Sequence, residues 1–202
     1  TDLDPSVLGN VFEKTINYLT SDNEDRNKEL GAYYTPSEIT RFCAEETVQP
    51  ALLDRFQTVL MEERDWPEPE VEKFDTVYEL IEDIPSSWSL VSALLAEVDN
   101  FRVVDPACGS GHFLTSVLEE IVTVRKALYV HYEDEDEDGD EEPYPDEYRL
   151  KKTTVLNNIY GVDLVGPAVE IAKLRCWLSV ISELETDNVD DLANDDALAL
   201  PN

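Results

Sequence analysis

The sequence predicts an α/β fold, namely the beginning of a parallel doubly wound sheet preceded by a helical region. Three observations carry this prediction: a β-rich run at 101–104, a glycine-containing turn at 105–111 and a second β-rich run at 158–164. An apolar helical segment follows each run, and strand, turn, helix, strand and helix in this order are typical of a parallel sheet. We therefore divide the chain into a helical region, 1–100, and the first part of a sheet domain, 101–202.

The helical region begins with two predicted helices. Between Val7 and Leu19 the apolar side chains recur on one helical face. A second helix is expected to begin sharply at Thr35, because Thr35 can cap it, Pro36 suits its first turn and Glu38 completes a capping box.

Later helices follow from the same periodicity. Residues 66–70 (WPEPE) break the helical pattern, and a helix over 86–98 follows. Gly166 and Pro167 open the helix after the second strand. The apolar faces comprise Trp88, Val91, Leu94, Leu95 and Val98 in the helix at 86–98; Phe113, Leu114, Val117, Leu118 and Ile121 after the glycine turn; and Ile171, Leu174, Leu178 and Ile181 in the last helix.

An acidic insert at about 133–148 interrupts the sheet domain. Its core, 133–142, reads EDEDEDGDEE. Like charges at this density repel each other and stay solvated, which predicts a surface loop between helix and strand. A calcium site is the alternative, although the run lacks the spaced ligands and closing glutamate of an EF-hand loop.

The overall charge is strongly negative. The chain of 202 residues has 46 acidic and 15 basic residues, a net charge of −31, and 42% apolar residues. This apolar content is too high for a wholly disordered acidic chain. An acidic excess spread along a globular pattern predicts a halophilic protein, whose carboxylates keep the surface hydrated at high salt. An acidic DNA mimic is the alternative, but it has no need of the glycine turn.

Cellular location is also predicted from the sequence. No apolar run is long enough to span a bilayer, and the first residues lack the features of a signal peptide. We expect a cytoplasmic protein without a membrane partner. The three cysteines, Cys43, Cys108 and Cys176, are widely spaced and are interpreted as free thiols rather than as a zinc or disulfide framework.

The glycine turn has the composition of a ligand-binding loop. Gly109 and Gly111 allow a tight turn and close approach of a ligand to the backbone. The third glycine of a dinucleotide fingerprint is absent, because Phe113 and Leu114 occupy that region, so a pyrophosphate cradle is poorly supported. S-adenosyl-L-methionine (AdoMet) has no pyrophosphate, and Asp105 at the strand end suits its ammonium group.

The end of the second strand carries a matching acidic residue. Asp163 can accept hydrogen bonds from both hydroxyls of a ribose, with Leu164 along the adenine face. The alternative is that Asp163 caps the helix that follows.

Three segments together resemble one enzyme family. They are GAYYTP at 31–36, DPACGSGHFL at 105–114, and YGVDL at 160–164 with AVEIAKLR at 168–175. In this order they resemble the N6-adenine DNA methyltransferases of type I, fused restriction–methylase and phage-exclusion systems. The similarity extends from about Leu8 to the last residue and is poorest over 65–97 and the acidic insert.

The resemblance implies a Rossmann-like AdoMet-dependent methyltransferase fold, incomplete in this chain, that acts on an adenine flipped out of double-stranded DNA. By resemblance Thr35 would contact the methionine end of AdoMet, Tyr34 would shape the pocket and Asp163 would hold the ribose; core packing is the alternative for Tyr33 and Tyr34. It also implies that DNA binds through the missing C-terminal part, with a restriction or specificity subunit as a further partner. The expected cofactor-binding residues are Tyr34, Thr35, Asp105, Ala107, Gly109, Gly111, Asp163 and Leu164.

One departure from the family limits the assignment. The family's catalytic Asn/Asp-Pro-Pro-aromatic tetrapeptide does not occur, so no catalytic residue is assigned, and we expect this chain alone to be inactive. Asp195 or Asp196 only weakly resembles the adenine-contacting acidic residue of the next segment. Two alternatives stay open: the same fold acting on RNA, protein or a small molecule, and a non-enzymatic acidic binding module. Sequence beyond Asn202 and AdoMet binding would discriminate among them.

Overall fold

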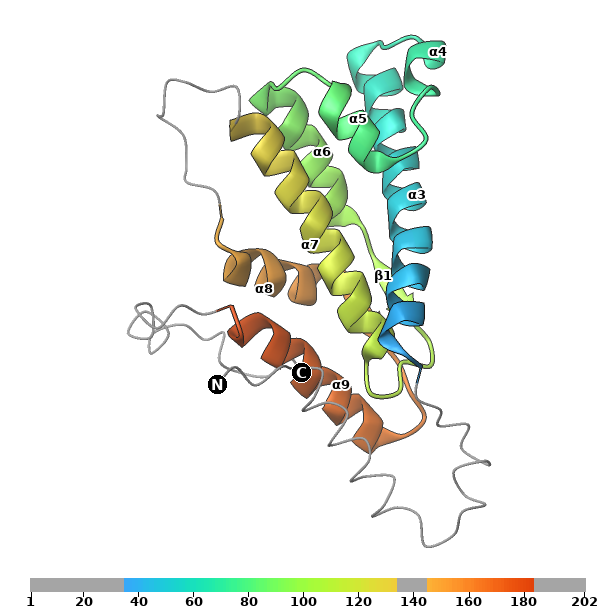
Figure 1. Ribbon diagram of the computed structural model, residues 1–202, viewed down its shortest axis with the longest axis vertical. Helices are drawn as coiled ribbons and strands as arrows, with labels where there is room; N and C mark the ends of the chain where they lie inside the picture. Colours follow the sequence, from blue (N-terminus) through green and yellow to red (C-terminus); the bar gives the residue numbers. More distant parts are fainter. Residues whose placement is uncertain (1–34, 134–144, 184–202) are drawn as a thin grey trace, which may run out of the picture.

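The protein is mostly helical, with one small parallel sheet (Figure 1). The computed structural model describes residues 35–133 and 145–183. The predicted helix at 7–19, Tyr34, most of the acidic insert and Asp195 and Asp196 lie outside these residues. The elements are α3 (Ser37–Arg64), α4 (Glu68–Val71), α5 (Val77–Asp83), α6 (Trp88–Asn100), β1 (Val103–Asp105), α7 (His112–Glu133), α8 (Glu147–Asn157), β2 (Ile159–Gly161) and α9 (Gly166–Ile181).

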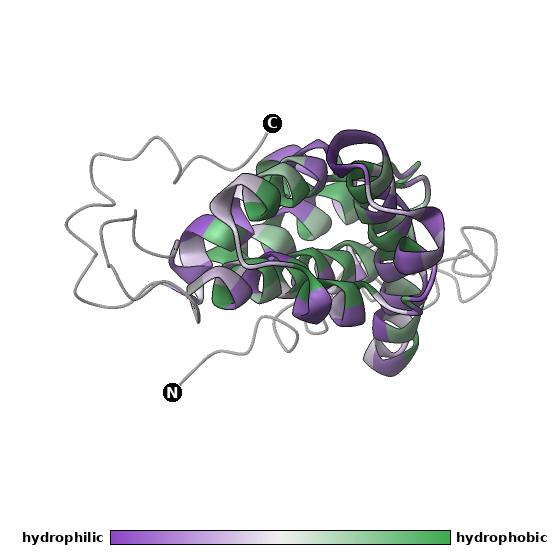
Figure 2. Ribbon diagram, turned by 90° about the horizontal axis from the view of Figure 1, so that it is seen from above, coloured by the Kyte–Doolittle hydropathy of each residue, from purple (hydrophilic) through white to green (hydrophobic). Residues whose placement is uncertain are grey.

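Helix α7 is the central element of the fold. It packs along α3, and α5 and α6 lie beside the ends of α3 and α7 that are farther from the sheet (Figure 1). Helix α7 also contacts α8 and α9. Apolar side chains fill the space between these helices, whereas polar residues face outward (Figure 2). The buried side chains of α3 recur almost every fourth residue, which gives one continuous apolar stripe. This stripe comprises Thr40, Ala44, Val48, Leu52, Phe56, Val59 and Leu60.

The start of α3 corrects one prediction. Helix α3 begins at Ser37, with Pro36 in the N-cap position and no side-chain cap, so Thr35 does not cap it. The amides of Ile39 and Thr40 bond to the Pro36 carbonyl, which places Thr35 one residue too early to act as the cap.

A complete capping box occurs instead at α5, a helix that the sequence analysis missed. The Thr76 hydroxyl accepts a hydrogen bond from the Glu79 amide at 3.1 Å, and the Glu79 carboxylate accepts one from the Thr76 amide at 3.3 Å. The Thr-x-x-Glu pattern was therefore a usable signal at this place in the sequence.

The helix break and α6 largely agree with expectation. Helix α3 ends at Arg64, and Asp65 adopts a left-handed conformation with φ 56°. Pro69, however, lies in the first turn of α4, where proline is tolerated. In α6, Trp88 was wrongly assigned to the apolar face: its ring is 45% exposed and packs on Tyr132 with centroids 5.2 Å apart, while Leu90 is buried in its place.

The two predicted strands pair in parallel. Val103 is aligned with Ile159 and Asp105 with Gly161. Ile159 is buried beneath α7, whereas alternation places Val104 and Tyr160 on the opposite face, where they are exposed. The β1–α7–β2 order confirms the predicted strand, turn, helix and strand.

Helix α9 buries a different face from the expected one. Ile171 is buried as predicted, but Leu174, Leu178 and Ile181 are only partly buried. The inward face instead packs against the glycine turn through Ala172, whose Cα would lie 2.9 Å from a Cβ on Gly111. The face turned inward comprises Ile171, Ala172, Arg175, Cys176, Ser179 and Val180.

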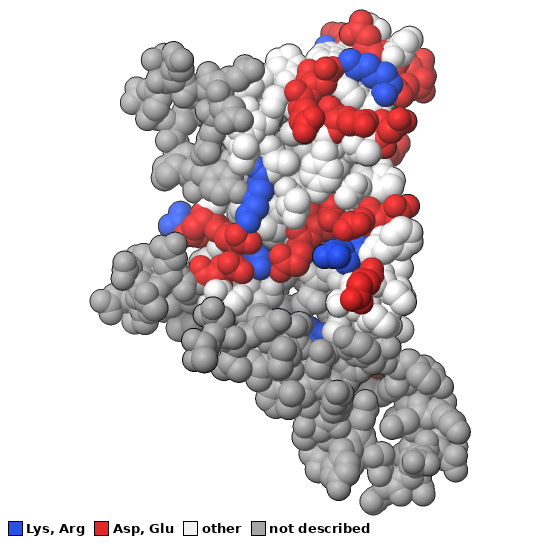
Figure 3. Space-filling view, viewed as in Figure 1, with Lys and Arg blue, Asp and Glu red and all other residues white. Residues whose placement is uncertain are grey.

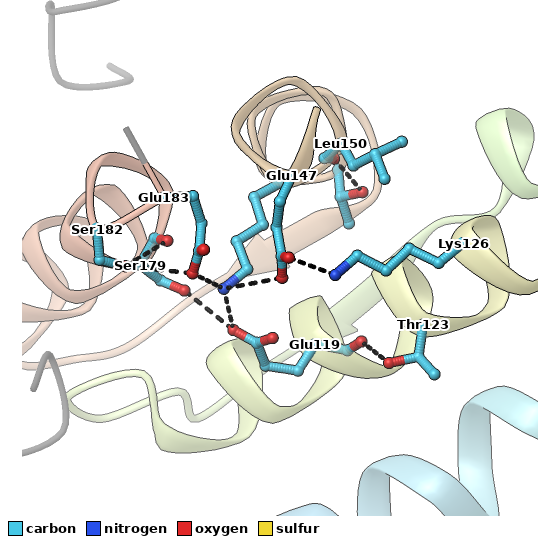
Figure 4. A network of polar contacts seen from close by, with 10 residues as sticks. Glu119, Thr123, Lys126, Glu147, Leu150, Ser179, Ser182 and Glu183 are labelled. Atoms are coloured by element: carbon cyan, nitrogen blue, oxygen red, sulfur yellow. Dashed lines mark hydrogen bonds and ion pairs between the residues drawn. The ribbon is translucent and has the colours of Figure 1, made fainter. Parts of the chain in front are cut away.

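Ion pairs join α7, the unpredicted helix α8 and α9 (Figure 4). The buried Lys151 ammonium lies 2.9 Å from the Glu119 carboxylate and 2.8 Å from that of Glu183. Burial alone would lower the pKa of Lys151, but the hydrogen bonds to these two carboxylates outweigh it and raise the pKa. Because Lys151 lies in α8, Glu119 in α7 and Glu183 two residues after the end of α9, the network ties the helix before β2 to both neighbours.

The surface of the described residues is rich in carboxylates. Acidic side chains gather around α4 and α5 and again across the middle of the face shown in Figure 3. Among the described residues no helix is both long and apolar enough to cross a bilayer.

Candidate cofactor-binding site

The glycine turn connects β1 to α7 through two left-handed residues. Gly109 has φ 51° and Gly111 has φ 85°, a region that other residues rarely adopt. A Cβ on Gly111 would lie 2.9 Å from both Cα and Cβ of Ala172, whereas a Cβ on Gly109 would meet nothing within 4 Å. Gly111 therefore allows α9 to pack against the turn, and Gly109 faces open space.

Backbone hydrogen bonds continue the sheet into this turn. The Val162 amide donates to the Asp105 carbonyl, and the Cys108 amide donates to the Val162 carbonyl, both at 2.9 Å. Beneath them Gly161 packs closely, because a Cβ there would lie 2.7 Å from the Leu114 side chain and 3.0 Å from the Cys108 sulfur. The glycine turn and the end of β2 thus form one rigid unit.

Asp163 links the two sequence motifs directly. Its Oδ2 accepts a hydrogen bond from the Gly109 amide at 2.8 Å, and its Oδ1 accepts one from the Val165 amide at 2.8 Å. Val165 is the N-cap residue of α9, so Asp163 also orders the start of that helix. A carboxylate offers about four lone-pair sites, and two of them stay free for a ligand.

The other predicted site residues lie around the same turn. Asp105 Oδ1 accepts from the Ala107 amide at 3.0 Å, and the strand register sets Asp105 beside Gly161, two residues before Asp163. Ala107 is exposed, and Leu164 is fully exposed at 103%. Asp105, Ala107, Gly109, Gly111, Asp163 and Leu164 therefore lie within one connected unit.

Thr35 is the remaining described site residue. It is half-buried and lies two residues before α3, whose first turn is beside that of α7 at the glycine-turn end of the molecule (Figure 1). Its assignment to the cofactor site stays a prediction.

Comparison with known families shows to which family the chain belongs. Residues 81–200 match the family model described as MmeI, DNA-methyltransferase domain. The chain belongs to the MmeI DNA-methyltransferase domain family. The match contains the glycine turn, both strands and Asp163, so the site described above is part of this methyltransferase domain.

Two curated relatives are similar to much of this chain. A Methanocaldococcus jannaschii protein named as a type II restriction enzyme and methyltransferase is 39% identical over 189 residues, which is 92% of this chain and 15% of that protein. The adenine-specific methyltransferase BrxX of Escherichia coli O9:H4 (strain HS) is 25% identical over 142 residues, 69% of this chain and 10% of BrxX. The chain thus spans a small part of either relative. No solved structure matches it significantly.

Burial shifts the pKa values of three side chains near the glycine turn. Burial, and then the charges of Asp105 and Asp163, raise the pKa of the Cys108 thiol. Burial, and then the charge of the nearby Arg175, lower the pKa of His112 to about 4. Burial raises the pKa of Cys176 to about 12. At neutral pH both thiols and the imidazole are therefore uncharged.

A separate hollow of about 640 Å³ lies between α3, α5 and α7. Glu120 in its wall is buried and accepts hydrogen bonds from Gln49 at 2.8 Å and from the Tyr78 hydroxyl at 2.9 Å. Burial and the bond to Glu120 raise the pKa of Tyr78. Neither Asp105 nor Asp163 lines this hollow, so it is distinct from the glycine-turn site.

The residues at the glycine turn fit AdoMet in chemical type. Open space above Gly109 leaves the backbone accessible, and two carboxylates at neighbouring strand ends match an ammonium group and a ribose. Among the described residues no group of His, Cys, Asp and Glu could hold a metal ion. The calcium alternative for the acidic run 133–142 lies almost wholly outside these residues.

Proposed function

We propose that this chain is the AdoMet-binding portion of a site-specific DNA adenine-N6 methyltransferase of a restriction-modification-type system. Membership of the methyltransferase family supports the reaction, and the names of the two relatives support the system and the adenine target. In the whole protein, double-stranded DNA is the substrate and a restriction or specificity subunit is a further partner. We place the protein in the cytoplasm, together with its DNA substrate.

The single observation that carries the cofactor site is the bond between Asp163 and the Gly109 amide. It joins the acidic residue after the second strand to the glycine turn. Asp163 then binds the ribose hydroxyls, Asp105 binds the ammonium group, and the exposed Leu164 covers the adenine. Tyr34 and Thr35 close over the methionine end. Bound AdoMet supplies the methyl group.

The fold that we propose for the domain is Rossmann-like, with β1 and β2 as its first strands. Their parallel register and the helical connection between them support this, since such units cross over in one hand and extend into larger sheets. Val104, Tyr160 and Val162 are exposed on the outer face of the sheet, and this exposure supports the proposal that further elements cover that face. Sheets of this kind are buried on both faces.

Calorimetric titration of AdoMet at molar KCl tests the cofactor site. We expect Asp163→Asn to weaken binding by about 1–3 kcal/mol, as for loss of a charged hydrogen-bond partner. Glu170→Gln is the matched control, because it removes the same charge from an exposed position on α9 whose described contact is an ion pair with Lys173. Equal affinity of the unmodified and Asp163→Asn chains would remove Asp163 from the site.

The acceptor side is proposed to lie outside this chain, because no Asn/Asp-Pro-Pro-aromatic tetrapeptide occurs in it. Orienting the adenine amine toward the methyl group accounts for about 7–11 kcal/mol of such a barrier. We therefore expect no methylation of duplex DNA by these 202 residues with tritiated AdoMet, and methylation by a longer chain that carries the tetrapeptide. Methylation of RNA, protein or a small molecule by that longer chain would favour the other acceptor classes.

A further inference from the structure

A relay of two hydroxyl groups crosses the interface between α3 and α7. Thr40 is completely buried, and its oxygen accepts a hydrogen bond from the Ser116 hydroxyl at 2.8 Å. Thr40 in turn donates its own proton to the Ser37 carbonyl at 3.1 Å. Both hydroxyls therefore donate in the same direction, from α7 toward the first turn of α3.

Each end of the relay is attached to a segment of the proposed cofactor site. The Thr40 amide donates to the Pro36 carbonyl at 3.1 Å, so Thr40 holds the turn that follows Thr35. Next to Ser116, the Thr115 amide donates to the Gly111 carbonyl at 3.0 Å, and the Thr115 hydroxyl lies 3.2 Å from that carbonyl and 3.0 Å from the His112 carbonyl. The relay therefore connects the start of α3 to the glycine turn.

The position of Thr40 in the apolar stripe shows why the hydroxyl matters. The other buried residues of the stripe, from Ala44 to Leu60, are apolar, so a valine at position 40 would continue the pattern. Apolar contact is non-directional, whereas a hydrogen bond fixes both distance and orientation. Helix α3 has no side-chain cap of its own. Its first turn is instead held from outside, by Ser116 through Thr40.

We propose that Thr40 and Ser116 are positioning residues that set the Thr35–Pro36 turn relative to the glycine turn, and thereby over the methionine end of AdoMet. The inference rests on the proposed function, in which Thr35 contacts that end of the cofactor. Neither Thr40 nor Ser116 touches the cofactor itself. Their effect is on the geometry of the site rather than on its composition.

Two ligands separate positioning from general stability. AdoMet carries the methionine end, whereas 5′-methylthioadenosine retains the adenosine and lacks the amino-acid part. We expect Thr40→Val and Ser116→Ala each to raise the dissociation constant of AdoMet about tenfold, the scale of one lost buried hydrogen bond. The dissociation constant of 5′-methylthioadenosine should stay within about twofold in both variants. The double variant should lose less than the product of the single losses, because the two residues act through one bond.

The matched control is Thr47→Val, on the same helix. Thr47 is exposed, and its hydroxyl bonds within α3 to the Cys43 carbonyl at 2.6 Å. We expect this variant to bind both ligands as the unmodified chain does. Circular dichroism of each variant identifies those that fold, and Ser116→Ala, at a half-buried position, provides the test if Thr40→Val does not fold.

The possible outcomes are distinguishable. Selective weakening of AdoMet binding supports the proposal. Equal weakening of both ligands, or no change in either, overturns it while the proposed function stands. If the unmodified chain binds neither ligand at molar KCl, the proposed cofactor site fails, and the positioning role fails with it.

Discussion

The helical half of the molecule and its sheet end differ in how far large apolar side chains are exposed. Between α3, α5, α6 and α7 the large side chains of Phe56, Leu80 and Leu94 are fully buried, with no exposed area. At the sheet end Val162 is 57% exposed and Leu164 is 103% exposed. Contiguous apolar surface is uncommon on monomers and marks places where something binds. The helices therefore contain most of the buried core, and the proposed ligand site lies at the sheet end, where several apolar side chains are exposed.

The largest expected contrast is between a core residue and a residue of the outer sheet face. Leu118→Ala should cost about 2–5 kcal/mol, because Leu118 is completely buried in α7 and its removal leaves a cavity. Val104→Ala, at a position 61% exposed, should change stability by about 0.5 kcal/mol or less. Urea unfolding at constant high salt measures both values. A similar cost at the two positions would mean that the outer face is covered in solution.

Substitution of the two glycines of the turn by alanine should cost different amounts of stability. Gly111→Ala combines a positive φ with a clash against the backbone of Ala172, and we expect a loss of about 3 kcal/mol. Gly109→Ala has the positive φ but open space, so about 1 kcal/mol is expected. Its main effect should be on AdoMet affinity, because the added methyl group points into the proposed ligand space. Equal stability costs would contradict the different functions assigned to these glycines.

The glycine-turn end should also show a pH dependence of stability, through His112. The pKa of His112 is lowered to about 4 in the folded protein, below its ordinary value of 6.5. As pH falls from 6.5 to 4 the unfolded chain takes up a proton that the folded chain does not, so stability is lost in this window. Because His112 is only partly buried, we expect about 2 kcal/mol from this group.

Comparison with His112→Gln isolates that contribution from the many titrating carboxylates. The difference in unfolding free energy between the two proteins should be flat above pH 6.5 and should shift in favour of the variant by pH 4. Parallel curves over the whole window would show that His112 is accessible to protons in the folded state.

The smallest expected effect concerns the acidic surface shared by both halves. A net charge of −31 destabilises the compact state by self-repulsion, and salt screens that repulsion. We expect thermal melting to shift upward between dilute buffer and molar KCl, by several degrees for about 1–2 kcal/mol in a chain of this size. A flat or falling profile would argue against the halophilic interpretation and favour the acidic DNA mimic.

The sequence predicted local elements better than it predicted the packing. The glycine turn, both strands and the helices after them could be predicted because local patterns determine them: two glycines after a β-rich run, and Gly166-Pro167 before a helical repeat. Helices α4, α5 and α8 were not predicted: α4 and α5 have only four and seven residues, and α8 begins within the predicted acidic insert. The cofactor-binding roles of the eight residues stay predictions, as does the division at residue 100, across which α3 and α7 share one core.

What the sequence alone determined is the order of elements and the types of residues at the two strand ends, because turns, caps and periodicity depend on neighbours in the chain. What only the tertiary structure decided are contacts between distant segments. The bond from Gly109 to Asp163 spans 54 residues, and the bond from Ser116 to Thr40 spans 76. The buried face of α9 belongs to the same class, since the close approach of Ala172 to Gly111 outweighs the more apolar stripe on the helix. Hydrophobic periodicity indicates which faces can be buried, but steric fit against a partner decides which face is.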